Sequence, residues 1–159
     1  MASGVKVADQ VKEIYNAMKL VKTEDNQMER MRLVIFHIDG SCIDVEKIFR
    51  EKDLEKEDDV YKFVLSQLKA DECRYILYDC HFETKESKKE ELVFFLWAPD
   101  TAPIKLKMNY ASSKEALRKI LTGIKHEVQL NDKTDCGDRA AFGERLGKNV
   151  IKIEGHDIK

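Results

Sequence analysis

Residues 92–97 are Leu-Val-Phe-Phe-Leu-Trp, a run that contains no polar side chain. A strand that is covered on both faces has such a run, because successive side chains point to opposite faces and both faces are apolar. We therefore predict that Leu92 to Trp97 is a central strand with helices on both sides. Arg74 to Phe82 is typical of its partner strand, and the charged segment Glu83 to Glu91 is predicted to join the two.

Towards the N-terminus, the sequence predicts a helix, a hairpin and a second helix. Apolar residues after Asp9 recur at helical spacing over about residues 8 to 21. The pair Asp39-Gly40 separates Met31 to Ile38 from Cys42 to Ile48 and predicts two antiparallel strands. Asp58-Asp59 can then cap a helix whose buried face comprises Val60, Phe63, Val64 and Leu68.

Towards the C-terminus, Pro99 and Pro103 interrupt the chain before Ile104 to Met108, where a period of two suggests a short strand. The helical signal from Ser112 to Val128 includes the capping-box spacing Ser112-x-x-Glu115. A later helix is predicted near Asp138 to Leu146, ended by Gly147, followed by a strand over Val150 to Ile153. Together these elements predict an α+β fold in a single domain over residues 1–159, with three layers.

The composition limits the classes of function. The chain has 159 residues, of which 43% are hydrophobic and 36% are charged, with a formal net charge of -2, so a nucleic-acid partner is not expected. No segment approaches the about 18 apolar residues of a membrane-spanning helix, and Met1-Ala2-Ser3-Gly4 lacks the features of a signal peptide. A cytoplasmic protein is therefore expected. The four cysteines have no C-x-x-C spacing, and we expect all of them to be reduced.

A search for catalytic chemistry finds one candidate, Asp79-Cys80-His81, which would suggest a cysteine hydrolase. Neighbouring side chains of a strand point to opposite faces, so Cys80 cannot be activated by His81 while the segment is extended. The histidines lack the spacing of zinc ligands, and no glycine-rich phosphate loop is present. We therefore predict that the protein is not an enzyme and that it uses no metal and no cofactor.

Basic residues are the remaining candidates for a site. Lys114, Arg118 and Lys125 are separated by four and seven residues, so on a continuous helix they share the face opposite its apolar side. Lys119 and His126 would form the next row, and Lys105 and Lys107 precede the helix. Such a patch is either a solvated face or a contact for an acidic protein surface or anionic lipid.

Many short segments of the chain occur in one order in a known family. They are Ala2-Ser3-Gly4-Val5, Cys73-Arg74-Tyr75, Tyr78-Asp79, Glu83-Thr84-Lys85-Glu86-Ser87-Lys88-Lys89, Trp97-Ala98-Pro99, Ala102-Pro103, Lys107-Met108, Tyr110-Ala111-Ser112-Ser113-Lys114 and Leu121-Thr122-Gly123-Ile124-Lys125-His126-Glu127. With these segments the chain resembles the ADF/cofilin family of actin-depolymerising proteins. The resemblance is strong over residues 2–18 and 73–155, and residues 22–58 diverge more from vertebrate cofilins.

The resemblance implies an ADF-homology domain, in which a mixed sheet lies between helices and a flexible segment covers residues 1–6. It also implies a short helix over Ile104 to Tyr110, in conflict with the period-two pattern. Members bind monomeric and filamentous actin, prefer ADP-bound subunits, and promote severing and depolymerisation of filaments. The positions implied for both forms of actin are Ser3, Gly4, Lys105, Lys107, Met108, Ser113, Lys114, Arg118 and Lys119. Those implied for filaments alone are Lys88, Lys89, Glu91, Glu144, Arg145 and Lys148.

The resemblance also implies how binding is regulated. Ser3 matches the serine that LIM and TES kinases phosphorylate and that a phosphatase restores. Phosphatidylinositol bisphosphate is expected to compete with actin for Lys105, Lys107, Lys125 and His126. Glu91 is acidic where some relatives are basic, so a smaller or differently paired contribution of the hairpin is expected. The basic nuclear-import cluster of the vertebrate proteins has no counterpart, because Met28 to Arg32 is interrupted, and a monomer at the cytoplasmic actin cytoskeleton is expected.

Two alternatives to a severing factor remain open. The first is a lipid-surface adaptor that binds phosphoinositides without actin. The second is a relative that binds actin without severing it, as coactosin-like proteins do.

Overall fold

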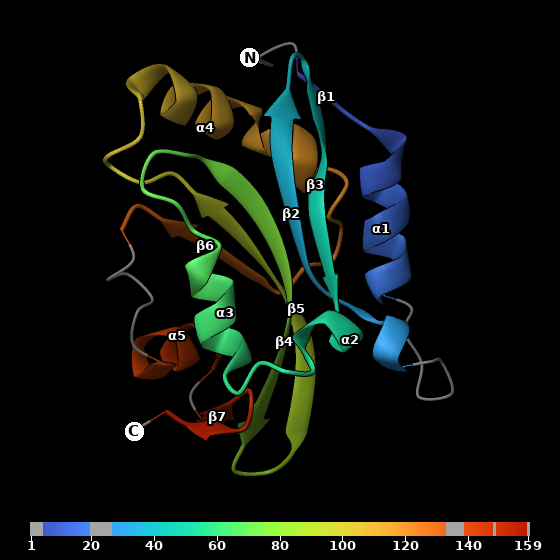
Figure 1. Ribbon diagram of the computed structural model, residues 1–159, viewed down its shortest axis with the longest axis vertical. Helices are drawn as coiled ribbons and strands as arrows, with labels where there is room; N and C mark the ends of the chain where they lie inside the picture. The colour runs from blue at the N-terminus through green and yellow to red at the C-terminus, as the bar shows by residue number, and fades with distance from the viewer. Residues whose placement is uncertain (1–4, 20–26, 133–138, 148, 159) are drawn as a thin grey trace.

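The computed structural model describes residues 5–19, 27–132, 139–147 and 149–158, and Figure 1 shows how their helices and strands are arranged. A twisted mixed sheet lies between two layers of helices, as the sequence predicted. No helix among these residues is long and apolar enough to cross a membrane. The four-residue start of the predicted flexible segment lies outside the described residues, and Lys6 already belongs to a strand.

The main path of the sheet follows the order β1-β3-β2-β4-β5-β6. Most neighbours are antiparallel, but β1 runs parallel to β3 and β6 runs parallel to β5. Two further strands, β7 and β8, lie off this path, and β7 pairs with β4. The strands are β1 (Lys6–Val7), β2 (Met31–Asp39), β3 (Cys42–Arg50), β4 (Arg74–Thr84), β5 (Lys88–Trp97), β6 (His126–Leu130), β7 (Val150–Ile153) and β8 (His156–Asp157).

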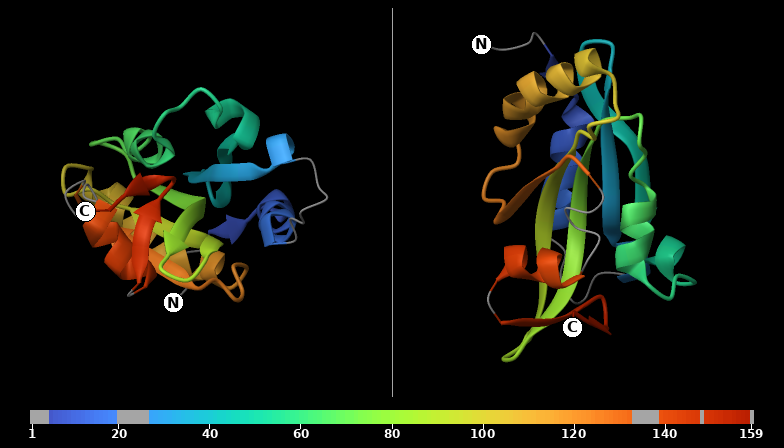
Figure 2. Two further views of the ribbon diagram at one scale, coloured as in Figure 1. Left: turned by 90° about the horizontal axis from the view of Figure 1, so that it is seen from below. Right: turned by 90° about the vertical axis from the view of Figure 1, so that its left-hand side faces the viewer.

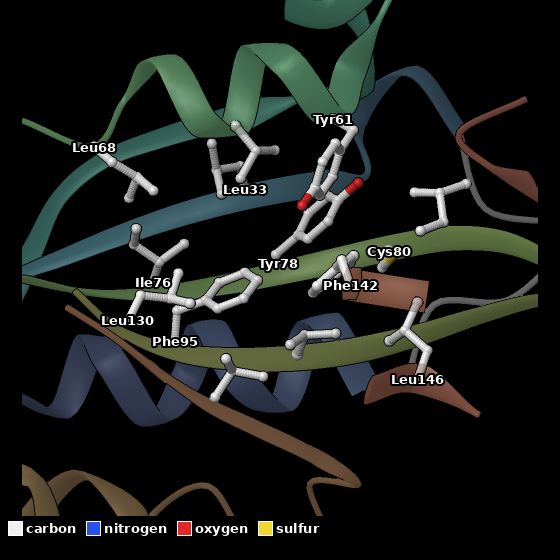
Figure 3. Close-up of a cluster of buried hydrophobic side chains, with 14 of the residues drawn as sticks. Leu33, Tyr61, Leu68, Ile76, Tyr78, Cys80, Phe95, Leu130, Phe142 and Leu146 are labelled. Carbon is white, nitrogen blue, oxygen red and sulfur yellow. The ribbon is translucent and has the colours of Figure 1, made fainter. Parts of the chain in front are cut away.

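Two helices cover each face of the sheet. On one face, α1 (Asp9–Lys19) and α4 (Ile104–Arg118) contribute to a single core cluster. On the other face, α3 (Val60–Ser66) and α5 (Arg139–Leu146) pack against the sheet, as Figure 3 shows for Tyr61, Phe142 and Leu146. Short helices η1 (Gln27–Glu29) and α2 (Glu51–Leu54) lie beside the ends of β2 and β3.

The central strand is confirmed. β5 lies between β4 and β6, and its side chains are shared between the two cores: Val93, Phe95 and Trp97 belong to one cluster, and Phe94 and Leu96 to the other. The apolar run that predicted this strand therefore reflects the burial of both faces.

The two predicted hairpins are present. Gly40 begins the two-residue loop between β2 and β3 with a φ of 62°, a conformation that glycine adopts without a steric cost. The prediction that the whole segment from Glu83 to Glu91 connects the next pair is wrong. β4 and β5 extend to Thr84 and from Lys88, and Thr84 N donates to Ser87 O at 2.8 Å across a tight turn.

The helix predicted from Ser112 to Val128 is misplaced. α4 begins directly after Pro103, so Ile104 to Met108 is helical, as the family resemblance implied, and the period-two strand is wrong. Ser112 does not cap this helix, because it lies inside it and its hydroxyl donates to Asn109 O at 3.2 Å. The chain turns at Gly123, whose φ is 80°, and then forms β6 on the free edge of β5.

Two tyrosines fix α4 to the sheet. The hydroxyl of Tyr110 accepts a hydrogen bond from Ile38 N at 2.9 Å, and the hydroxyl of Tyr75 donates to Tyr110 O. Beyond the helix, the hydroxyl of Tyr15 donates to Thr122 O at 2.7 Å. The helix and the turn that follows it are therefore each held by a buried or partly buried polar contact.

The remaining predicted elements are found within the described residues. Asp59 caps α3 by accepting a hydrogen bond from Lys62 N, and α5 and β7 lie where the sequence placed a helix and a strand. Figures 1 and 2 show that α4 lies at one end of the long axis, and that the β4–β5 turn lies at the other end beside β7.

Candidate functional site

The outer face of α4 presents an exposed apolar pair. Ile104 is 70% exposed and Met108 is 66% exposed, and they lie four residues apart on the same side of the helix. They are the two most exposed large apolar side chains in the described part of the chain. The sequence analysis named Met108 but missed Ile104, because a helix beginning at residue 104 was needed to place the two side chains together.

Three further predicted basic positions lie on α4 or at its C-terminal end. Lys105 and Lys119 are exposed, the first at the start of α4 and the second at its C-cap. Lys107 is half-buried, and its Nζ atom donates to Asp100 O at 3.4 Å. The apolar pair therefore has Lys105 and Lys107 beside it in the first turns of α4, whereas Lys119 lies at the far end of the helix. Apolar and cationic side chains together suit a protein surface with acidic groups beside an apolar cleft.

Lys114 and Arg118 are on the helix as predicted, but both are already paired. Glu127 of β6 contacts Lys114 Nζ at 2.7 Å and Arg118 Nε at 3.0 Å. Arg118 also contacts Glu115 at 2.7 Å. This cluster of two cations and two anions has no net charge, so the predicted basic stripe is neutralised at this point. The sequence could not show this, because the acidic partner comes from a strand that was predicted to be helix.

Ser113 differs from the other predicted positions on α4. Its residue is 1% exposed, and it lies with Tyr110 and Leu117 on the buried side of the helix. Its role as a contact remains a prediction, although its side chain does not face solvent.

The prediction that Lys125 and His126 continue the helical face is wrong. Lys125 lies in the connection after α4, and His126 is the first residue of β6. Glu91 binds both, with distances of 3.0 Å to Lys125 Nζ and 2.7 Å to His126 Nε2. Burial would raise the pKa of Glu91, but the hydrogen bonds from His126 and Lys125 outweigh it, and the pKa lies below its ordinary value. Glu91 is thus paired with β6 and the preceding loop, which gives a physical reason for an acidic residue there.

A second group of predicted positions gathers at the opposite end of the sheet. Lys88 and Lys89 are exposed on β5 next to the turn, and Glu144 and Arg145 are exposed on α5. The turn and the segment after α5 are joined directly, because Lys85 N donates to Asn149 O at 3.1 Å. We call the exposed group Lys88, Lys89, Glu144 and Arg145 the second surface. The structure therefore brings these residues from distant parts of the sequence to one end of the molecule (Figure 1).

Three predicted residues lie outside the described residues, namely Ser3, Gly4 and Lys148. The described chain begins at Val5, and β1 pairs with β3 at Lys6 opposite Cys42 and contacts α4. Cys136 also lies outside these residues, and Cys42, Cys73 and Cys80 are free thiols.

The cysteine-hydrolase alternative finds no support in the geometry. Cys80 is fully buried in the core cluster on one face of the sheet, and burial raises the pKa of its thiol well above the ordinary value. His81 instead lies beside Asp79, with Nε2 3.3 Å from Oδ2. Among the described residues, no group of three or more His, Cys, Asp or Glu side chains could hold a metal ion.

Comparisons with known proteins give consistent results. The model of the cofilin/tropomyosin-type actin-binding proteins matches residues 4–146. The crystal structure of a cofilin from Streptomyces griseoflavus is 35% identical, with a TM-score of 0.74, and the match covers 91% of this chain and 100% of that one. Actin depolymerization factor 2 of Plasmodium berghei is 28% identical over 85% of this chain and 92% of its own, with a TM-score of 0.71. Human coactosin-like protein, at 14% identity and a TM-score of 0.67 over 94% of this chain and 95% of its own, shares the fold.

Proposed function

Because this chain belongs to the ADF/cofilin family, whose members bind and depolymerise actin, we propose that it binds monomeric actin through the outer face of α4. We further propose that it binds filaments by adding the second surface, prefers ADP-bound subunits, and severs filaments. The single observation that supports this proposal best is the exposed pair Ile104 and Met108 with Lys105 and Lys107 beside it in the first turns of α4.

An exposed apolar pair on a surface helix favours a protein partner. Two large apolar side chains at 70% and 66% exposure would lose contact with water in a hydrophobic cleft, and the surrounding lysines can pair with acidic groups at its rim. Methionine suits such a contact because its unbranched side chain adapts to the shape of a cleft. The opposite side of α4 is not available, since it belongs to the core.

Filament binding requires a second contact in this proposal. The outer face of α4 and the second surface lie at opposite ends of the long axis, so one molecule could contact two neighbouring subunits at once (Figure 2). A second contact made by the same rigid molecule adds affinity through a high effective concentration. Binding that prefers a changed arrangement of the two subunits would shift the filament towards that arrangement and weaken neighbouring contacts.

Regulation is proposed at Ser3 and at the cationic residues. A phosphate on Ser3, added by LIM-type or TES-type kinases and removed by a phosphatase, would bring nearly two negative charges to the N-terminal segment, which leads into β1 beside α4. Repulsion from an acidic actin surface would then weaken docking. Phosphatidylinositol bisphosphate would compete through Lys105, Lys107, Lys125 and His126, although the last two must first give up Glu91.

We propose that the protein acts as a monomer at the actin cytoskeleton of the cytoplasm and performs no covalent chemistry. Co-sedimentation with filaments at low salt tests the actin interaction. Absence of the protein from the pellet at micromolar concentration, together with binding to vesicles that contain phosphatidylinositol bisphosphate, would favour the lipid-adaptor alternative.

Imaging of single filaments tests severing. We expect the number of filament ends to rise when the protein is added. Decoration of filaments without new ends would favour a coactosin-like binder, whose fold this chain shares.

A further inference from the structure

Strand β4 changes its hydrogen-bonding partner along one edge. β5 occupies the other edge from Arg74 to Glu83. On the changing edge, β2 pairs with β4 as far as Leu33 opposite Tyr78, and β7 pairs with it from Ile153 opposite Phe82. β4 therefore continues from the half of the sheet that carries α4 into the half that carries the second surface, and its partner changes between Asp79 and His81.

Arg32 and Glu154 lie at the point where β4 changes its partner from β2 to β7. Arg32 is the residue of β2 before Leu33, and its Nε atom donates to Asp79 O at 3.1 Å. Glu154 follows β7, and its backbone N donates to His81 O at 2.8 Å. The two side chains form an ion pair, with Nη2 of Arg32 2.5 Å from Oε1 of Glu154. The pair thus connects the end of one strand to the end of the other across the gap.

Burial and backbone conformation show how closely this pair is held. The Arg32 side chain is 2% exposed and that of Glu154 is 4% exposed, and the hydroxyl of Tyr78 donates to Glu154 Oε2 at 2.8 Å. Glu154 has a φ of 52°, the left-handed conformation that a residue with a side chain rarely adopts. Such a conformation persists where surrounding contacts determine it, and here those contacts are Arg32, Tyr78 and His81.

The position of β7 in turn determines that of the second surface. The core residues Phe142 and Leu146 of α5 pack in the same cluster as Val150 and Ile153 of β7. The packing is close, since a Cβ atom added to Gly143 would lie 3.2 Å from Ile158 and 3.7 Å from Ile153. The segment between α5 and β7 also contacts the β4–β5 turn through Asn149. A displacement of β7 would therefore move α5 relative to Lys88 and Lys89.

We propose that the Arg32–Glu154 ion pair is a positioning element that fixes the second surface relative to the outer face of α4. It thereby controls filament binding without touching actin. A shift of β7 away from β2 would leave the buried Glu154 carboxylate without its cationic partner, which strongly disfavours the displaced arrangement. This inference rests on the proposed function, because it requires that the two surfaces act together on a filament.

The test compares filament and monomer binding in Glu154→Gln. We expect filament affinity to fall about tenfold, because the gain from a second, correctly placed contact is lost. Monomer affinity should stay within about twofold, since α4 is anchored through Tyr75 and Tyr110 at the other end of the sheet. An equal fall in both affinities, or no fall in either, would overturn the proposal.

A matched control separates the effect of the Arg32–Glu154 ion pair from the effect of burying Arg32 itself. Glu51 of α2 also contacts Arg32, at 2.6 Å, but it does not lie on β7. Glu51→Gln is expected to leave filament affinity unchanged. A loss of filament affinity equal to that of Glu154→Gln would contradict a specific role for the Arg32–Glu154 ion pair. If Glu154→Gln does not fold, Arg32→Met combined with Glu154→Gln removes both charges and should show the same selective loss.

Hydrogen exchange tests the inference without actin. In Glu154→Gln, exchange should become faster in α5 and β7, while exchange in α4 stays unchanged. If the wild-type protein fails to bind filaments, the proposed function fails, whereas unchanged exchange in α5 and β7 would refute the positioning role by itself.

Discussion

Oε1 of Glu127 lies 2.7 Å from Nζ of Lys114, so the most prominent lysine of the predicted basic stripe is paired within the molecule before any partner arrives. The same carboxylate contacts Arg118 at 3.0 Å. An acidic partner must therefore share these cations with Glu127 or displace it. The attraction that the sequence suggested is weaker than a count of basic residues implies.

Glu127→Gln is expected to strengthen actin binding about threefold at low salt, because the local cluster changes from no net charge to one positive charge. Affinity measured over a range of ionic strengths checks this, and the gain should shrink as salt rises. Glu57→Gln is the matched control, since it makes the same change of charge at an exposed position away from α4. A weaker interaction in Glu127→Gln would show instead that the carboxylate holds the two cations in their binding orientation.

Lys114→Ala combined with Arg118→Ala is expected to weaken actin binding about tenfold while leaving the fold intact. Both side chains lie outside the core, and they form ion pairs with Glu115 and Glu127. Thermal unfolding should change little, because ion pairs at the surface contribute little to stability. Unchanged affinity would remove these two residues from the contact surface.

Ile104→Ser combined with Met108→Ser is expected to weaken actin binding at least about tenfold, because the apolar anchor is lost. Stability should be nearly unchanged, since the two side chains are 70% and 66% exposed. Met28→Ser is the control, because Met28 is also an exposed apolar residue but lies on η1. Equal effects of the control and the double variant would argue against a specific anchor.

The contribution of Asp79 to stability is expected to disappear in acid. Burial would raise the pKa of Asp79, but the hydrogen bond and charge of His81 and the contacts of Arg30 outweigh it, and the pKa lies below its ordinary 3.8. Because the folded pKa is lowered, the stabilising effect is present above the unfolded value and is lost as pH falls through the folded value. Asp79→Asn should cost about 2 kcal/mol at neutral pH.

The measurement for Asp79 is the free energy of unfolding in denaturant between about pH 2 and pH 6. The wild-type protein should lose more stability than Asp79→Asn below about pH 4, so that the two curves converge. Parallel curves would mean that the carboxyl is not ionised with a lowered pKa in the folded protein.

Ser3→Glu is expected to weaken actin binding and Ser3→Ala to leave it unchanged, because only the first adds a negative charge to the N-terminal segment. Monomer binding measured by fluorescence and filament binding measured by co-sedimentation should both show the difference. Equal affinities of the two variants would contradict regulation at this residue.

The sequence predicted the sheet better than it predicted the main helix of the site. The run Leu92 to Trp97 identified the central strand, because burial on both faces leaves a pattern within one segment. The helix was predicted too far along the chain, because apolar residues keep helical spacing across the turn after α4 and into β6. These residues are Leu117, Leu121, Ile124 and Val128. Only the free edge of β5, a feature of the assembled sheet, explains why the last of them forms β6.

The sequence identified the basic residues of the site but not the acidic residues with which they form ion pairs. Lys114, Arg118, Lys125 and His126 were recognised as basic, whereas their partners Glu127 and Glu91 come from strands whose register no local pattern shows. The buried Arg32–Glu154 pair lies 122 residues apart in the chain, and neither residue belongs to a motif. Long-range ion pairs of this kind follow from the topology rather than from periodicity.

The attachment of α4 by Tyr75 and Tyr110 has a mechanical consequence. The Tyr110 hydroxyl accepts a hydrogen bond from the backbone N–H of Ile38, and the Tyr75 hydroxyl donates one to the backbone carbonyl of Tyr110. The helix is therefore held to β2 and β4 near its middle. Little conformational entropy is left for α4 to lose on docking, and little freedom is left for it to bend. Such a helix enters a partner's cleft as a rigid body, so any conformational change on binding has to occur in the partner.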